Sequence, residues 1–262
     1  MEKTVCELFA GVGGLSYGFA HDSDFQIIAA NEILKPMAIA YSLNHPTVKV
    51  YNKDIKEFSL ADLTADFNLH KGDIDIVIGG PPCQAYSTVG KRLIDDPRGK
   101  LFQEYFRVLS EIRPKMFIFE NVKGILSIQK GELFAQIISL FQSLGYRVKW
   151  KTLNAADYGT PQIRERVIII GSIWGTEFEY PQPTHRDIDD CNLYNTHLKP
   201  YITLGEAIGD LPPIKSGEKC SVYNSEPQTE YQRAMREGAT QELADHETPQ
   251  NNEKLIKLME AL

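Results

Sequence analysis

Short runs of consecutive apolar residues alternate with longer stretches of helical apolar spacing over residues 1–170. Continuous apolar runs are typical of strands covered on both faces, and their alternation with helices predicts an α/β fold with a doubly wound, mostly parallel sheet. Strands are expected over residues 5–9, 26–30, 48–51, 73–78, 116–119, 146–153 and 166–171. Helices are expected over residues 34–44, 60–69, 101–112 and 133–144.

The pattern changes near residue 175, where prolines begin to interrupt a polar stretch. We expect a first domain over 1–172 and a short, irregular and helical extension over 173–262, with helices over 203–211, 227–236 and 251–262. The charge divides in the same way, with a net charge of +1 in residues 1–170 and −8 in residues 171–262. The acidic total of −7 argues against loose binding of polyanions but leaves room for a local basic groove.

Composition narrows the class of protein further. Apolar residues make up 42 % and charged residues 24 % of the 262 residues, which is typical of a globular chain with a sizeable core. The four cysteines form no C-x-x-C pair, so neither a zinc site nor a disulfide framework is expected, and we predict no metal. No apolar run approaches the roughly 18 residues of a membrane span and no leader pattern is visible, so we expect a cytoplasmic protein.

In a doubly wound sheet the ligand lies at the carboxyl ends of the strands, so the residues that follow each strand are informative. The first strand is followed by a glycine turn over 9–14, the second by Glu32, and the third by Asp54. Glycines permit close approach of the backbone to a ligand, and a carboxylate about 20 residues later suits ribose hydroxyls. Taken by themselves these residues fit NAD, FAD or S-adenosylmethionine, or a tight turn without a ligand. The dinucleotide pattern has a third glycine where this chain has Ser16, which disfavours NAD.

The fourth strand is followed by the segment Gly79–Ser87, in which Pro81 and Pro82 precede Cys83. Prolines restrict the backbone, so this thiol is held rigidly at the ligand crevice. We interpret Cys83 as a nucleophile, the alternative being a buried and inert cysteine. Cys6 lies within the first strand and is expected in the core.

Two further segments carry groups suited to catalysis. Glu120 and Asn121 follow the fifth strand, where an acid in a dry crevice suits proton donation; the alternative is a helix N-cap or a solvated turn carboxylate. Arg164 and Arg166 are two residues apart, so on an extended chain they share one face and could bind phosphate or a base carbonyl. The alternative is an edge strand with solvated charges.

The segment after Cys83 is basic, and a basic loop beside a nucleophile could close over a polyanion. A solvated loop is the alternative. Its residues of interest are Gln84, Ser87, Lys91, Arg92 and Arg98.

The ordered series ELFAGVGGL, NE, DI, GGPPCQAYS, FENV and TPQIRERV, over residues 4–171, resembles the motif series of the cytosine-C5 methyltransferases. Residues 181–211 resemble the connector between the catalytic and target-recognition domains of that family. The PPCQAYS, GKR and DPRG segments are more similar to the bacterial DNA enzymes than to the tRNA-methylating branch. The resemblance implies a Rossmann-like, S-adenosylmethionine-dependent methyltransferase fold and methylation of a flipped-out cytosine in double-stranded DNA, in a restriction–modification or prophage setting.

The resemblance also implies roles for individual residues. Cys83 would attack C6 of cytosine, Glu120 would hold the N3 edge and supply a proton, Arg164 would bind the carbonyl, Arg166 would support the site, and Asn121 would brace the Pro-Cys loop. The residues implied at S-adenosylmethionine are Phe9, Ala10, Gly11, Gly13, Gly14, Leu15, Glu32, Ile33, Asp54, Ile55, Gly80, Pro82 and Leu101.

Complete members of the family continue into a variable recognition domain and two later motifs, which we do not find in this chain. Residues 1–172 are therefore expected to be the cofactor-binding catalytic domain, and residues 173–262 the connector and the start of a recognition lobe. We expect a truncated enzyme, a remnant, or the larger half of a split enzyme with a complementing chain. The alternatives are a tRNA cytosine-5 methyltransferase and a non-catalytic module that binds cofactor or a partner subunit.

Overall fold

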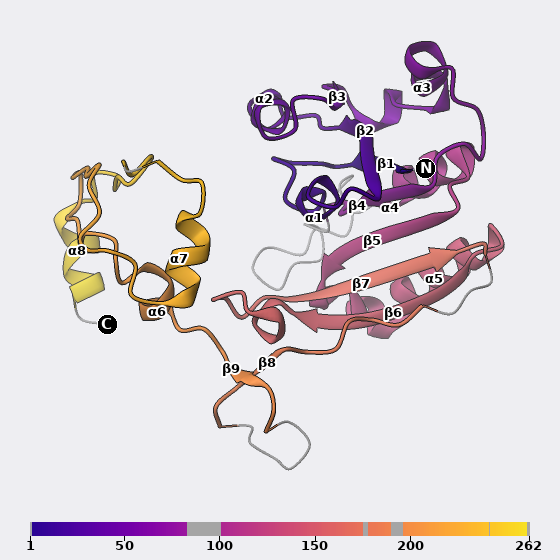
Figure 1. Ribbon diagram of the computed structural model, residues 1–262. Coiled ribbons are helices and arrows are strands. Elements are labelled where there is room, and N and C mark those ends of the chain that lie inside the picture. Colours follow the sequence, from indigo (N-terminus) through magenta and orange to yellow (C-terminus); the bar gives the residue numbers. More distant parts are fainter. Residues whose placement is uncertain (1, 83–100, 175–177, 190–195, 241, 261–262) are drawn as a thin grey trace. The chain divides into compact units, whose positions relative to one another are not determined.

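The computed structural model describes residues 2–82, 101–174, 178–189, 196–240 and 242–260. The larger of its two compact units comprises residues 1–153 and 165–181 and contains a seven-stranded sheet (Figure 1). The order of the strands in this sheet is β3-β2-β1-β4-β5-β7-β6. The strands are β1 (Lys3–Leu8), β2 (Phe25–Asn31), β3 (Lys49–Tyr51), β4 (Ile76–Gly79), β5 (Met116–Val122), β6 (Arg147–Asn154) and β7 (Glu165–Ser172).

The predicted doubly wound, mostly parallel sheet is confirmed. Strand β1 pairs in parallel with β2 and β4, β2 pairs in parallel with β3, and β4 pairs in parallel with β5. The chain winds outward from β1 in one direction and from β4 in the other, so the order of the strands reverses between these two neighbours. Such a reversal opens a ligand crevice at the carboxyl ends of the strands.

Helices cover both faces of the sheet. They are α1 (Tyr17–Ala20), α2 (Lys35–Asn44), α3 (Leu60–Phe67), α4 (Leu101–Ile112) and α5 (Glu132–Ser143), with 3₁₀ turns η1 (Ile55–Glu57), η4 (Lys123–Leu126), η5 (Ile128–Gly131) and η6 (Ala155–Tyr158). Alternate strand residues point to opposite faces. Cys6 and Leu8 therefore join the core formed with α3, α4 and α5, whereas Val5 packs with residues of α1. Cys6 is fully buried, as expected from its place in the strand.

The fifth strand is longer than the sequence pattern predicts. The prediction that Glu120 and Asn121 close the strand is wrong, because β5 continues to Val122. Pairing with β4 ends at Phe119, but β7 runs antiparallel on the other side of β5 and pairs with it as far as Val122. The antiparallel neighbour thus keeps Glu120 in extended backbone beyond the end of β4.

Gly171 of β7 lies against Phe117, a fully buried side chain whose ring centroid is 4.4 Å from that of Phe141. A Cβ at position 171 would overlap the Phe117 ring. We therefore expect Gly171→Ala to lower the free energy of unfolding by about 1–3 kcal/mol, the usual cost of overpacking. Urea unfolding measures this change. The matched control is Gly18→Ala in α1, where a Cβ meets no atom within 4 Å and alanine is the better helix former. Equal midpoints for the wild type and Gly171→Ala would contradict the prediction.

The smaller compact unit comprises residues 154–164 and 182–262. Its elements are β8 (His185–Arg186), β9 (Lys199–Pro200), α6 (Leu204–Ile208), α7 (Glu230–Arg236) and α8 (Glu253–Glu260). Capping boxes at Thr203 and Thr229 fix the starts of α6 and α7, and the Thr229 hydroxyl donates to the Glu206 carbonyl. The functional division at residue 173 stays a prediction. None of the described helices is long and apolar enough to cross a bilayer.

Candidate active site

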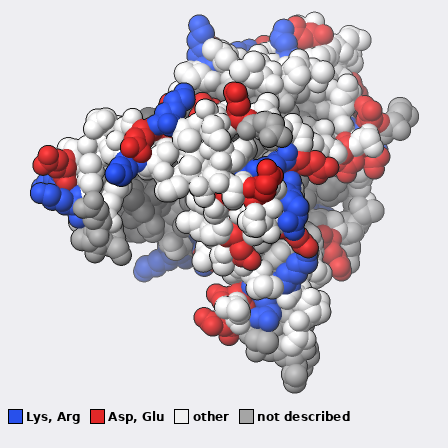
Figure 2. All heavy atoms as spheres, turned by 60° about the vertical axis from the view of Figure 1, so that its left-hand side comes forward, with Lys and Arg blue, Asp and Glu red and all other residues white. Residues whose placement is uncertain are grey.

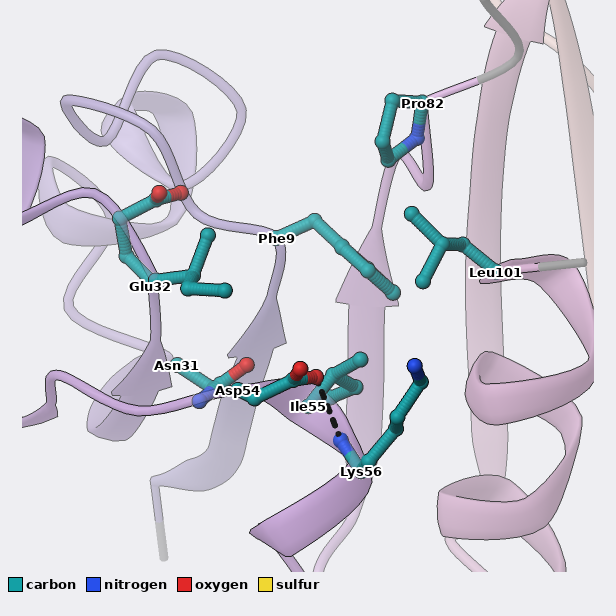
Figure 3. Close-up of a pocket in the computed structure, with 9 residues that line it drawn as sticks. Phe9, Asn31, Glu32, Asp54, Ile55, Lys56, Pro82 and Leu101 are labelled. Carbon is teal, nitrogen blue, oxygen red and sulfur yellow. Dashed lines mark hydrogen bonds between the residues drawn. The ribbon is translucent and has the colours of Figure 1, made fainter. Parts of the chain in front are cut away.

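A pocket of about 250 Å³ lies at the carboxyl ends of the strands on the side of β1, β2 and β3 (Figure 3). Five chain segments line it: the end of β1, the end of β2, the segment after β3, the residues directly after β4, and the start of α4. The lining residues are Phe9, Asn31, Glu32, Ile33, Asp54, Ile55, Lys56, Pro82 and Leu101. The side chains of Phe9, Ile55 and Leu101 converge on the cavity (Figure 3).

Phe9 begins the glycine turn that follows β1. Its φ of 56° is unusual for a bulky residue, and such backbone strain is concentrated at functional sites. The neighbouring amide of Ala10 donates to the Asn31 carbonyl at 3.0 Å, which ties the start of the turn to the end of β2. The ring of Phe9 is thereby held at the pocket as an apolar surface for a flat ligand.

Glu32 connects the glycine turn to the end of β2. One carboxylate oxygen accepts from the Gly11 amide at 2.9 Å and the other from the Leu34 amide at 2.7 Å. The side chain is buried, yet each oxygen of a carboxylate can accept a second hydrogen bond. Glu32 can therefore hold the turn in place and still accept from a ligand hydroxyl.

The segment after β3 forms a further wall of the pocket. Asp54 caps η1, and its Oδ1 accepts from the Lys56 amide at 3.0 Å (Figure 3). Ile55 is buried and presents an apolar side chain to the cavity, while the Lys56 side chain extends toward the cavity from the other side of η1. The pocket thus combines apolar walls with two carboxylates, and these hydrogen-bond acceptors fit the amino group of an adenine base and the hydroxyls of its ribose.

Seven of the expected cofactor residues line this pocket: Phe9, Glu32, Ile33, Asp54, Ile55, Pro82 and Leu101. Ala10, Gly11, Gly13, Gly14, Leu15 and Gly80 lie in the adjoining loops rather than in its wall; the side chain of Leu15 packs against the core near Val5. Asn31 and Lys56 were not expected at the site. Each directly adjoins a residue that was, and this adjacency is the signal that could have indicated them.

Glu120 and Arg166 form an ion pair on the β5–β7 ribbon, with 2.7 Å between Arg166 Nε and Glu120 Oε1. Both side chains are three-quarters buried. The other carboxylate oxygen lies beside Gly80, where an added Cβ would be 2.8 Å from Glu120 Oε2. Gly80 therefore leaves room for the Glu120 carboxylate where the loop leaves β4.

Asn121 is buried and its Nδ2 donates to the Pro81 carbonyl at 3.0 Å. This bond ties β5 to the two-proline loop that leads toward Cys83. Arg164 precedes β7, and its amide donates to Asn154 Oδ1 at 3.0 Å. Arg164 belongs to the smaller unit and Arg166 to the larger one.

Several expected site residues lie outside the described residues. They are the nucleophile Cys83 and the loop residues Gln84, Ser87, Lys91, Arg92 and Arg98. On the described surface that Figure 2 shows, basic and acidic side chains are interspersed. In the described part of the chain, no group of three or more histidine, cysteine, aspartate or glutamate side chains could hold a metal ion.

Comparisons with known proteins identify the family to which the chain belongs. The profile of the family described as C-5 cytosine-specific DNA methylase matches residues 3–259. The chain therefore belongs to the C-5 cytosine-specific DNA methylase family, as the order of its motifs indicates.

Two curated relatives illustrate the similarity. Type II methyltransferase M.AgeI of Thalassovita gelatinovora is 37 % identical over 93 % of this chain and 59 % of its own length. Type II methyltransferase M.AquIA of a Picosynechococcus strain is 40 % identical over 81 % of this chain and 90 % of its own length.

Among solved structures, a DNA modification methyltransferase encoded within an Escherichia coli prophage is similar, with a TM-score of 0.65 and 28 % identity. The similarity covers 83 % of this chain and 57 % of that one. The chain therefore spans between half and two thirds of the length of M.AgeI and of this solved structure.

Proposed function

We propose that the chain catalyses transfer of a methyl group from S-adenosylmethionine to C5 of cytosine in double-stranded DNA. The observation that carries the proposal is the pocket at the reversal of the sheet, in which Phe9, Ile55 and Leu101 face Glu32 and Asp54. Apolar walls suit an adenine base and carboxylates suit hydroxyl and amino donors. The curated relatives are named Type II methyltransferases, which supports a restriction–modification setting. Action in the cytoplasm is part of the same proposal.

In this proposal the pocket residues bind and orient the cofactor. Phe9 and Ile55 enclose the adenine, Asp54 accepts from its amino group, and Glu32 accepts from the ribose hydroxyls. The glycine turn passes along the methionine part. Bound S-adenosylmethionine supplies the methyl group.

The remaining site residues act on the cytosine. C5 of cytosine is a weak nucleophile, so we propose that the Cys83 thiolate first adds to C6, which makes C5 an enamine carbon. Glu120 gives a proton to N3, so that negative charge does not build up on the ring. After C5 has taken the methyl group, the C5 proton passes to solvent, the C6–S bond breaks to release the Cys83 thiolate, and N3 returns its proton to Glu120, which restores the aromatic ring. The base must leave the duplex stack to reach these groups. Arg164 would bind its carbonyl, and Arg166 keeps the Glu120 carboxylate in place.

The test is a methyl-transfer assay with radiolabelled cofactor and three substrates: duplex DNA of mixed sequence, the same DNA already methylated at C5, and tRNA. We expect label in unmethylated duplex DNA alone, recovered as 5-methylcytosine. Label in tRNA and not in DNA would replace the proposal with the tRNA-methylating function.

A second candidate is the cofactor-binding half of a two-chain enzyme. The observation that favours it is that the chain corresponds to only 59 % of the length of M.AgeI. In that case the chain binds S-adenosylmethionine but transfers label to DNA only after a complementing chain with a recognition domain is added. Isothermal titration of the cofactor, run beside the transfer assay, distinguishes the two candidates.

A further inference from the structure

Four buried polar side chains form a continuous hydrogen-bonded chain beneath the glycine turn. Glu7 of β1, Ser16, Tyr41 of α2 and His45, which ends α2, are all less than one tenth exposed. The Tyr41 hydroxyl donates to Glu7 Oε2 at 2.9 Å and lies 3.1 Å from Ser16 Oγ. Ser16 Oγ in turn lies 3.4 Å from His45 Nε2. Burying four polar groups together is costly unless they hydrogen-bond to one another, so their arrangement restricts the turn above them.

At the Ser16–His45 end, these hydrogen-bonded side chains hold one backbone carbonyl of the glycine turn, that of Gly13. Ser16 Oγ donates to the Gly13 carbonyl at 3.2 Å, and His45 Nε2 lies 3.3 Å from the same oxygen. Next to it, Asn44 Nδ2 donates to the Val12 carbonyl at 2.8 Å. Gly13 itself has a φ of 91°, and a Cβ there would overlap the His45 ring. Position 13 therefore has to be glycine for the carbonyl to reach these donors.

The direction of this carbonyl also decides where an amide points. The peptide unit is planar and trans, so the Gly14 N–H points away from the Gly13 carbonyl and from the buried chain. A neighbouring amide that faces outward from a glycine turn is a donor for an anionic ligand group. The buried side chains thus fix the orientation of a donor on the opposite side of the turn.

We propose that Glu7, Tyr41, Ser16 and His45 position the Gly13–Gly14 peptide for the cofactor. We further propose that one proton gained or lost by these four hydrogen-bonded side chains changes cofactor affinity. This inference rests on the proposed function, because it takes the turn to be part of the cofactor site. Tyr41 and Ser16 are positioning residues, since they act on the ligand only through the turn.

The proton count gives the direction of the effect. When Glu7 is ionised, the Tyr41 hydrogen is used at Glu7, so the Ser16 hydrogen is divided between the Tyr41 oxygen at 3.1 Å and the Gly13 carbonyl at 3.2 Å. When Glu7 is protonated, it can donate to Tyr41, Tyr41 to Ser16, and Ser16 to the Gly13 carbonyl. The protonated state therefore leaves the Ser16 hydrogen to the Gly13 carbonyl alone and holds the turn more firmly.

Glu7 titrates in the range where this difference is measurable. Burial raises the pKa of its carboxyl from 4.5 to about 7, against the opposing effect of hydrogen bonds from Ser16 and Tyr41. The groups around it in the described structure are Cys6 on its own strand, Ser16 before α1, and Tyr41 and His45 from α2. Its neighbours on the two adjacent strands, Ala30 and Ile78, are uncharged.

The experiment measures the affinity of the full chain for S-adenosylhomocysteine by isothermal titration between pH 6 and 8.5. This ligand lacks the sulfonium charge, which removes one direct attraction to Glu7 that would oppose the effect. We expect affinity to fall by about fivefold from pH 6 to pH 8, which corresponds to one hydrogen bond of ordinary net strength. Glu7→Gln is expected to bind tightly at every pH, because its neutral amide can donate to Tyr41.

Two further variants separate positioning from folding. Tyr41→Phe removes the hydroxyl that links Glu7 to Ser16 and is expected to remove most of the pH dependence even though Glu7 still titrates. The matched control is Tyr105→Phe: Tyr105 is also fully buried, but its hydroxyl donates to the Ile118 carbonyl at 3.0 Å, outside the chain. This control should keep the wild-type pH profile. Thermal unfolding confirms that each variant is folded.

Three results would overturn the inference. A wild-type affinity that is flat between pH 6 and 8.5 excludes the effect of the proton. A wild-type pH profile in folded Glu7→Gln or Tyr41→Phe excludes the route through these residues. Absence of binding at every pH overturns the cofactor site itself and with it both proposals, whereas binding without pH dependence leaves the proposed function standing.

Discussion

Replacing Cys83 with serine is expected to abolish methyl transfer to DNA and covalent trapping on DNA that carries 5-fluorocytosine. The thiolate is the reactive form of cysteine, and a serine hydroxyl is scarcely ionised at neutral pH. We expect the rate to fall on the order of 10⁴-fold or more, the scale seen when a covalent nucleophile is removed. Affinity for S-adenosylmethionine should stay within about twofold, because the pocket residues remain.

Trapping separates the covalent step from other causes of inactivity. Fluorine at C5 cannot leave as the proton does, so the adduct with the enzyme persists and migrates as a larger species on a denaturing gel. The matched control is Cys220→Ser, since Cys220 lies in the smaller unit and its thiol donates to the Val222 carbonyl. It should trap as well as the wild type. Trapping by Cys83→Ser at the wild-type level would refute the covalent mechanism.

The second large effect is expected at Glu120. Glu120→Gln keeps the size of the side chain and can still bond to the base, but it cannot transfer a proton. We therefore expect the turnover number to fall about 10²- to 10⁴-fold, the usual contribution of a positioned general acid. The cofactor dissociation constant should be unchanged, because Glu120 lies outside the pocket wall.

The neighbouring acid on β7 provides the control. Glu165 forms an ion pair with Lys123 at 2.7 Å in which both side chains are exposed, and such surface pairs contribute little. Glu165→Gln should keep wild-type turnover. A second variant, Gly80→Ala, leaves the acid in place but brings a methyl group against its carboxylate, so it should lower turnover with normal cofactor binding. Equal turnover in the Glu120→Gln and Glu165→Gln variants would exclude the proposed acid.

Much of the fold could be predicted because its signals are local. Each parallel strand is a short apolar run, and α4 and α5 repeat apolar residues at helical spacing, so their positions and the class of sheet follow from the chain. Because these local runs also show where each strand ends, the residues that follow each strand could be predicted to face a ligand. This is why Phe9, Glu32 and Asp54, from three separate segments, were expected at the pocket that they line.

Other features could not be predicted because they depend on pairing between distant segments. Helix α1 has only four residues and no apolar repeat of its own. The length of β5 depends on its pairing with β7, which follows it by more than forty residues. Nothing in the sequence of β5 itself indicates that an antiparallel strand pairs with it. Ser16 was interpreted only as a missing glycine, whereas it is a buried link between Gly13 and Tyr41.

Motif order and apolar spacing are properties of the chain, so the family and the doubly wound sheet followed from the sequence, which also indicated the residues proposed to carry chemistry. Tertiary structure alone decided which of those groups meet: Glu120 with Arg166, Asn121 with Pro81, and Glu7 with Tyr41. The physical reason is that hydrogen bonds and ion pairs act over about 3 Å, and only folding brings residues tens of positions apart within that distance.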